Sequence, residues 1–155
     1  MWHYFPEHYM WSYQIVRMFS QAHFGGGEVN EILEAAGNIT LGNTESFHHA
    51  WMGAGNRTLA VANEAQDQEQ IETARAAYLR ASNYIRTAEF FLQPDDPRKI
   101  PTYLKGVESF RKGAEMLDNP PRAVQIPYEN SFLPGYFFAV PGKKDSPLVV
   151  MFGGL

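Results

Sequence analysis

Apolar residues recur every three or four positions along the first two thirds of the chain, the spacing of amphipathic helices. The spacing predicts five helices before residue 119, of which the one from about residue 68 to 93 has the most regular pattern. The predicted inward stripes are Trp11, Ile15, Met18 and Ala22; Val29, Ile32, Leu33 and Ala36; Phe47, Trp51, Ala54, Thr58, Val61 and Ala65; Ile71, Ala74, Tyr78, Ala81, Ile85, Ala88 and Leu92; and Leu104, Val107, Phe110, Ala114 and Leu117.

Glycine, proline and capping residues mark the ends of these helices. Glu28 suits the positive end of the second helix, Gly37 is placed to cap its C-terminus, and either Asn43 or Thr44 can cap the third. Gly53 and Gly55 weaken that third helix by about 1 kcal/mol each relative to alanine. Glycines at these positions allow a neighbouring helix to approach closely.

Beyond Pro120-Pro121 the hydrophobic period changes to about two, the period of strands. The change predicts a β-hairpin with strands near 122–128 and 132–140. Residues 148–152 form a continuous apolar run, which predicts a further strand buried on both faces.

A strand buried on both faces normally lies inside a sheet covered by helices, and one hairpin cannot supply those partners. We therefore interpret the chain as an N-terminal fragment of a larger protein. The predicted class is α+β, with a helical domain at 1–119 and the start of a second domain at 120–155.

Composition narrows the classes of function. The chain has 155 residues, of which 45% are hydrophobic and 19% charged, so it can bury a core. A net charge of −4 without a basic cluster predicts no nucleic-acid partner. The absence of cysteine excludes disulfides and thiolate sites, and no signal peptide or membrane span is visible. We expect a cytoplasmic protein without a membrane partner.

Four segments, in this order, resemble the N-terminal part of one group of α/β-hydrolases: 77–84 (AYLRASNY), 126–129 (IPYE), 133–137 (LPGYF) and 149–155 (VVMFGGL). The group contains 2,6-dihydroxypseudooxynicotine hydrolase, fermentation-respiration-switch esterase-like proteins and fungal heptaketide chain-shortening hydrolases. The resemblance implies a helical cap over a hydrolase core that cleaves ester, amide or activated carbon-carbon bonds of a small organic substrate, without a cofactor.

The same resemblance implies a catalytic serine on a Gly-x-Ser-x-Gly turn, followed by an acid and a histidine. None of the seven serines lies in that pattern, so the triad is expected beyond the end of this chain. What remains is the turn at Gly153, Gly154 and Leu155, whose backbone N–H groups are expected to help hold the oxyanion. Many hydrolases have His-Gly at this turn, and Phe152 here leaves open which amide donates.

His48, Trp51 and Tyr84 are the candidate substrate-binding residues of the cap. Packing within the helices is the alternative role for each. His48 and His49 are adjacent and point about 100° apart on a helix, so they cannot bind a metal ion jointly, and we expect no metal site.

Arg80 lies off the apolar stripe, where it is either solvated or paired with a carboxylate. The aromatic N-terminus can line a pocket, join a homodimer or pack on a core.

A helical-repeat interaction module of the tetratricopeptide kind is the alternative function. The helices around Tyr78 and Tyr103 suggest it, but these residues are 25 positions apart, whereas such repeats need 34. The β segment also has no place in a helical solenoid. The triplet Gly25 to Gly27 lacks the spacing of a phosphate-binding loop, and we interpret it as a linker.

Overall fold

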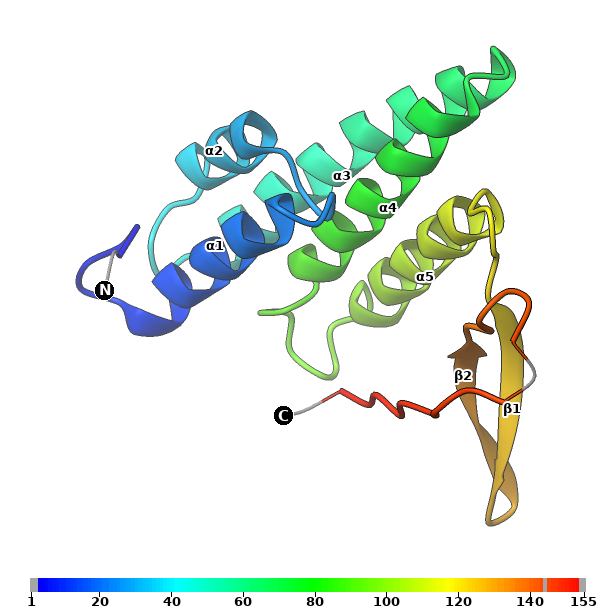
Figure 1. Cartoon of the computed structure of the whole chain (residues 1–155). Helices are drawn as coiled ribbons and strands as arrows, with labels where there is room; N and C mark the ends of the chain where they lie inside the picture. The colour runs from blue at the N-terminus through cyan, green and yellow to red at the C-terminus, as the bar shows by residue number, and fades with distance from the viewer. Residues whose placement is uncertain (1–2, 144, 154–155) are drawn as a thin grey trace. The chain divides into compact units, whose positions relative to one another are not determined.

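The computed structural model describes residues 3–143 and 145–153. The chain divides into a helical unit, Met1–Leu117, and a hairpin unit, Asp118–Leu155. Within the described residues, the helical unit holds five helices and the hairpin unit holds two antiparallel strands (Figure 1). This confirms the predicted α+β class, and every described helix lies before residue 119. The elements are α1 (Tyr9–Ala22), α2 (Val29–Gly37), α3 (Thr44–Asp67), α4 (Ile71–Ala88), α5 (Lys99–Glu115), β1 (Arg122–Tyr128) and β2 (Ser131–Phe137).

Side chains cap the starts of two helices, as the sequence predicts. The Glu28 carboxylate accepts hydrogen bonds from the backbone N–H groups of Asn30 (2.9 Å) and Glu31 (3.0 Å) at the start of α2. Asn43, rather than Thr44, caps α3, because its side-chain oxygen accepts from Ser46 N–H at 3.1 Å. Gly37 is the last residue of α2, and the C-cap is the next residue.

The core of the helical unit forms where α1, α2, α3 and α4 meet. Its largest members, including Trp51, Tyr84 and Phe47, have no exposed surface. The predicted stripe of α4 is buried from Ala74 to Ala88, although Ile71 at its start is 46% exposed. In α3 the stripe shifts by one position near its end, so Ala62 is buried and Val61 is exposed. The remaining residues of this core are Trp11, Ile15, Met18, Ile32, Ala35, Ala36, Ile39, Ala54 and Ala88.

A close approach between α3 and α4 depends on Gly55. A Cβ atom built on this glycine would lie 2.5 Å from Cγ1 of Ile85, far inside van der Waals contact. Gly53 faces only the end of the flexible Arg57 side chain, at 3.3 Å. The predicted contact is therefore confirmed for Gly55 and wrong for Gly53.

The predicted stripe of α5 is wrong at Leu104 and confirmed at Ala114, because α5 packs against α4 through small residues. Leu104 is 56% exposed, whereas the buried side of the helix is formed by Thr102, Gly106, Ser109, Gly113 and Ala114. A Cβ on Gly113 would lie 2.9 Å from Cγ of Leu79, so the two helices are too close for the larger residues of the predicted stripe. The close packing of α4 and α5 explains why α5 buries its small residues and leaves Leu104 exposed.

The described helices do not form a repeating pair. They are 14, 9, 24, 18 and 17 residues long in chain order, without the regular two-helix unit that a tetratricopeptide array requires. Within the ranges described, every helix is too short or too polar for a membrane span.

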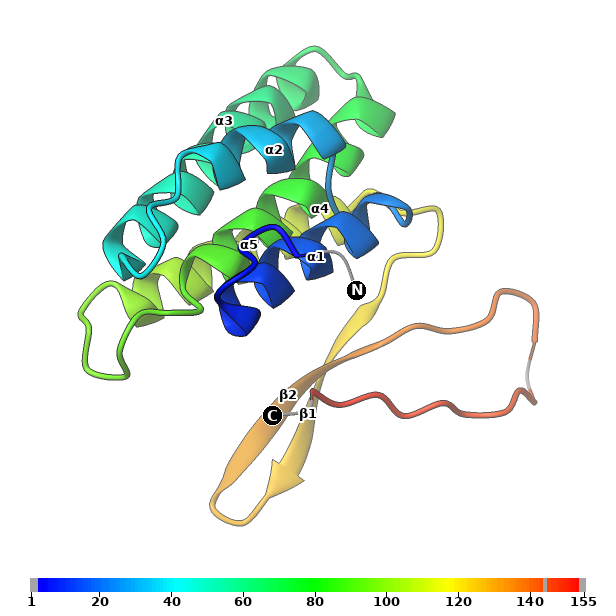
Figure 2. The ribbon, with the colours of Figure 1, turned by 90° about the vertical axis from the view of Figure 1, so that its left-hand side faces the viewer.

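The hairpin unit contains a two-stranded ribbon (Figure 2). Arg122 pairs with Phe137 at one end and Tyr128 with Ser131 at the other, which leaves a two-residue turn. The second strand ends at 137 rather than 140. The strand predicted at 148–152 is absent from the described residues, since this run is extended, unpaired and 70% to 89% exposed. A strand requires a hydrogen-bonded neighbour, and none of the described residues pairs with this run.

Arg98 holds the loop between α4 and α5 against the start of α3. Its guanidinium donates to both carboxylate oxygens of Glu45, at 2.6 and 2.9 Å, and to the carboxylate of Asp96, at 2.8 and 3.0 Å. These hydrogen bonds lower the pKa of Asp96 from 3.8 to about 2, and lower the pKa of Glu45 as well. The ionised carboxylates therefore stabilise this loop.

The pH dependence follows from the lowered pKa of Asp96. The contribution of Asp96 to the stability of the folded state is complete above about pH 3.8. It is lost as the pH falls toward about 2, because protonation removes the negative charge that Arg98 binds. We expect Asp96→Asn to lower the melting temperature relative to wild type above about pH 4, with the difference vanishing near pH 2. Thermal unfolding across this range checks it, with Asp95→Asn as the exposed neighbouring control. A constant difference at every pH would contradict the assignment.

Candidate functional site

Tyr84 joins α4 to the start of α2. Its hydroxyl accepts a hydrogen bond from Glu28 N–H (2.8 Å) and donates one to the Glu31 carboxylate (2.6 Å). Arg80, one turn earlier, donates two hydrogen bonds to the same carboxylate, at 3.1 and 3.2 Å. Burial, and then the hydrogen bond to Glu31, raise the pKa of Tyr84, so its hydroxyl stays protonated at neutral pH. Arg80 is thus paired with a carboxylate, one of the two alternatives left open by the sequence.

Removing the Tyr84 hydroxyl tests this connection. We expect Tyr84→Phe to lower the free energy of unfolding by about 1 to 3 kcal/mol, because it leaves the Glu28 N–H without its acceptor and the Glu31 carboxylate with Arg80 alone. Urea unfolding followed by circular dichroism measures the loss. Tyr103→Phe, at a 39% exposed position on α5, is the matched control. Equal stability of the two variants would show that the hydroxyl contributes nothing.

Trp51 and His48 lie on the inner side of α3. Trp51 has no exposed surface, and its ring centroid is 5.8 Å from that of Tyr84. His48 is 6% exposed, with Nδ1 at 3.0 Å from the backbone carbonyl of Ala88 on α4. Since a carbonyl only accepts, this nitrogen carries the proton. His48, Trp51 and Tyr84 therefore all occupy packing positions, and their contact with a substrate stays a prediction.

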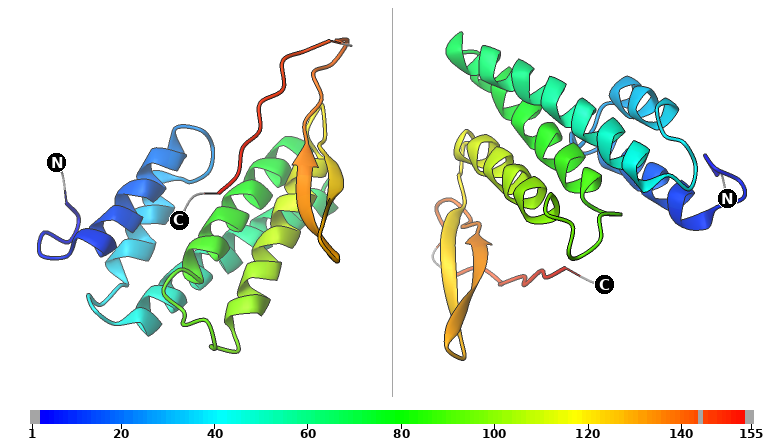
Figure 3. Two further views of the ribbon diagram at one scale, coloured as in Figure 1. Left: turned by 90° about the horizontal axis from the view of Figure 1, so that it is seen from below. Right: turned by 180° about the vertical axis from the view of Figure 1, so that it is seen from behind.

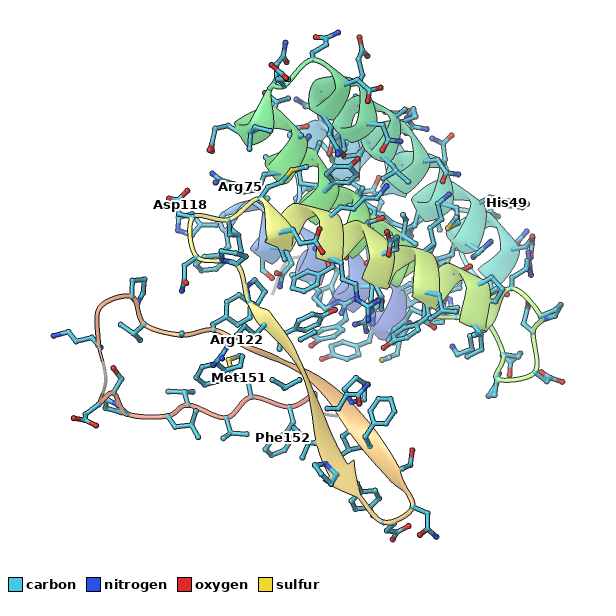
Figure 4. All side chains as sticks on the ribbon, turned by 90° about the vertical axis from the view of Figure 1, so that its right-hand side faces the viewer. His49, Arg75, Asp118, Arg122, Met151 and Phe152 are labelled. Carbon is cyan, nitrogen blue, oxygen red and sulfur yellow. The ribbon has the colours of Figure 1, made fainter. Side chains whose placement is uncertain are left out.

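The adjacent histidines have separate environments. Figure 4 shows His49 on the outer surface, where it pairs with Glu45 at 3.1 Å. No group of three or more potential metal-ligating side chains occurs within residues 3–143 and 145–153.

The predicted oxyanion turn is only partly described. Gly153 is exposed, and a Cβ built on it would meet nothing within 4 Å. Gly154 and Leu155 lie outside the described residues. The catalytic role of this turn therefore stays a prediction.

A cavity of about 360 Å³ opens beside α1, α4 and α5, and sequence reasoning missed it. The three helices lie side by side with α4 in the middle (Figure 3). A signal in the sequence could have identified the cavity, because polar residues at helical spacing flank the apolar stripes of α1 and α4. These residues are Arg17 and Gln21 on α1, and Ser82, Asn83 and Arg86 on α4. The remaining lining residues are Gly26, Leu79, Glu89, Phe90 and Phe110.

Two guanidinium groups give this cavity its charge. The guanidinium of Arg17 lies 5.9 Å from the ring centroid of Phe90, and that of Arg86 lies 5.7 Å from Tyr103. Burial lowers the pKa of Arg17, Tyr13 opposes this shift, and the positive charge of Arg86 adds to it. The cavity's one carboxylate, Glu89, is already bound by Lys99 at 2.9 Å.

Comparison with known proteins finds similarity to fungal hydrolases, whereas no family model matches. The chain is 35% identical over 157 residues to the alpha/beta hydrolase gkaG of Penicillium citrinum, covering 97% of this chain and 36% of that protein. It is 34% identical to the alpha/beta hydrolase psoB of Aspergillus fumigatus, covering 87% and 32%. It is 34% identical to the 20-hydroxy-prefusarin hydrolase FUS2 of Gibberella moniliformis, covering 92% and 36%. The chain spans about a third of the length of these curated relatives.

Proposed function

We propose that this chain is the N-terminal part of an α/β-hydrolase, with residues 1–119 as a helical cap and residues 120–155 as the start of the catalytic core. The observation that carries the proposal is the similarity, at about 35% identity over nearly the whole chain, to longer proteins named alpha/beta hydrolases. The order of a helical unit followed by a hairpin agrees with it. The reaction is hydrolysis of an ester, amide or activated carbon-carbon bond of a small organic substrate.

The chemistry assigned to this chain is stabilisation of negative charge. When a serine attacks a carbonyl carbon, the carbonyl oxygen becomes an oxyanion that needs fixed hydrogen-bond donors. Backbone N–H groups at Gly153, Gly154 and Leu155 supply such donors after the apolar segment 148–152. Glycine suits this turn because it lets the backbone come close to the reacting atoms. The serine, the acid and the histidine come from the part of the protein outside this chain.

The three candidate cap residues act on the substrate indirectly in this proposal. Trp51 and Tyr84 have no exposed surface, and His48 bonds a backbone carbonyl of α4. They maintain the packing of α2, α3 and α4, and thereby the shape of the cap surface that the substrate meets.

Activity measurements on two lengths of protein test the proposal. We expect the 155-residue chain to show no turnover of p-nitrophenyl esters above background, because none of its serines lies in a Gly-x-Ser-x-Gly turn. A reading frame extended beyond Leu155 is expected to contain that motif about 60 to 80 residues later and to hydrolyse such esters.

The control for this experiment is serine substitution. Replacing the motif serine in the extended protein is expected to abolish turnover. Saturable turnover by the 155-residue chain, lost on substituting one of its own serines, would place the active site within this chain and contradict the proposal.

A further inference from the structure

We infer that the cavity beside α1, α4 and α5 binds a small organic anion, whose carboxylate lies between Arg17 and Arg86 and whose apolar body lies against Phe90, Leu79 and Phe110. This is a binding site of the helical unit itself, and it does not depend on the hydrolase chemistry proposed above.

Arg17 lines the cavity, and among the described residues its guanidinium has no carboxylate partner. Its Nε atom is buried and makes no hydrogen bond in the described part of the chain. Because a buried N–H normally has a partner, the guanidinium of Arg17 is not fully satisfied by the described residues. The guanidinium of Arg17 lies over the ring of Phe90, at 5.9 Å from the ring centroid, which is a cation–π contact.

Arg86 makes the cavity positive rather than neutral. It lines the cavity together with Arg17, and among the described residues neither arginine has a carboxylate partner. Glu89, which also lines the cavity, is bound by Lys99. Two adjacent unneutralised guanidinium groups repel each other, and an anion between them would relieve that repulsion. A carboxylate fits their planar donors in a bidentate manner.

The neutral polar residues narrow the chemistry of the ligand. Asn83 is already committed, because its side-chain amide donates to the Gly26 carbonyl at 2.6 Å. Ser82 lines the cavity, and its hydroxyl makes no hydrogen bond in the described part of the chain, so it can add one neutral donor. The side chains of Arg17, Arg86, Ser82 and Gln21 therefore remain available to the ligand, and each of them can donate a hydrogen bond.

One part of the cavity lining is apolar. Phe90 is 40% exposed, and Leu79 and Phe110 complete this wall. A volume of about 360 Å³ lies at the lower end of the range for small-molecule sites. Inorganic phosphate would leave this wall uncovered. The combination favours a compact carboxylic acid with a flat or branched hydrocarbon body.

Isothermal titration calorimetry of the full chain at low ionic strength tests this inference, with 1-naphthoate as the probe. We expect saturable binding, and we expect Arg17→Gln and Arg86→Gln each to raise the Kd about tenfold or more, as expected for loss of a charge-assisted hydrogen bond. Neutral 1-naphthamide and inorganic phosphate are each expected to bind at least about tenfold more weakly than 1-naphthoate.

Arg122→Gln is the matched control, because Arg122 also lies over an aromatic ring, at 5.1 Å from Phe137, but belongs to the hairpin unit at the start of β1 (Figure 4). Its Kd is expected to equal that of wild type. Arg86 is exposed, so Arg86→Gln decides the question even where Arg17→Gln fails to fold. No saturable binding of 1-naphthoate, or an unchanged Kd in Arg86→Gln, would overturn the site. Phosphate binding as tight as that of 1-naphthoate would overturn the assignment of an organic anion.

Discussion

Gly55→Val is expected to lower the free energy of unfolding of the helical unit by about 3 kcal/mol, at the upper end of the cost of overpacking a core. A Cβ at this position would lie 2.5 Å from Cγ1 of Ile85 and 3.3 Å from its backbone nitrogen. Ile85 has no exposed surface, so it has no free space into which to move. The two methyl groups of valine extend the clash, and α3 has to separate from α4.

Gly53→Ala is the matched control, two residues away on the same helix. Its Cβ meets only the mobile end of Arg57, so the gain in helix propensity dominates, and we expect stabilisation by about 0.5 to 1 kcal/mol. Urea unfolding of both variants by circular dichroism measures the two effects. Destabilisation of similar size in both would show that the packing of α3 on α4 does not decide the outcome.

Gly154→Val is expected to reduce turnover by about 10²- to 10³-fold in the longer hydrolase that we propose, the usual cost of losing one oxyanion donor. A β-branched residue restricts the backbone and keeps the reacting atoms at a distance. Folding of the helical unit is expected to be unaffected, because the substitution lies in the hairpin unit. Steady-state kinetics and the melting temperature separate a catalytic from a structural effect.

The control for the oxyanion turn is an equally bulky substitution elsewhere. Gly37→Val, at the exposed end of α2, where a Cβ meets nothing within 4 Å, is expected to leave turnover unchanged. Normal turnover in a folded Gly154→Val protein would remove the only catalytic role assigned to this chain. The role of oxyanion donor would pass to Gly153 or Leu155 only if substituting that residue reduced turnover by a similar factor.

The helices could be predicted from the sequence because their signals are local. Glu28 and Asn43 cap helices through atoms two or three residues away, and the stripe from Ala74 to Ala88 follows from spacing alone. The hairpin is equally local, since Tyr128 and Ser131 pair across a two-residue turn.

Which face a helix buries depends on the helices packed against it. For this reason the buried face of α5 could not be predicted from its own sequence. On α5, the pattern of large apolar residues indicated Leu104, but α4 comes so close that the buried positions hold small residues, such as Gly106, Gly113 and Ala114. The segment 148–152 has the composition of a strand, yet pairing requires a second strand, which its own sequence cannot provide.

The cavity was missed for a related reason. Arg17 and Arg86 are ordinary surface-type residues when each helix is considered alone, and the folded chain brings them together from positions far apart in sequence. Conversely, His48, Trp51 and Tyr84 are residue types common in binding sites, but tertiary packing places them in the core.

The carboxylate of Glu31 receives hydrogen bonds from both Arg80 and Tyr84, and this sharing constrains how the protein can evolve. Losing Glu31 alone would leave a cation and a hydroxyl without their acceptor, whereas losing Arg80 alone would leave a partly buried anion held by one neutral group. Single substitutions are therefore selected against, and an exchange of all three for apolar residues is tolerated more readily than any intermediate. Positions 31, 80 and 84 are expected to co-vary as a triplet among homologous sequences, although α2 and α4 are separated by the whole of α3 along the chain.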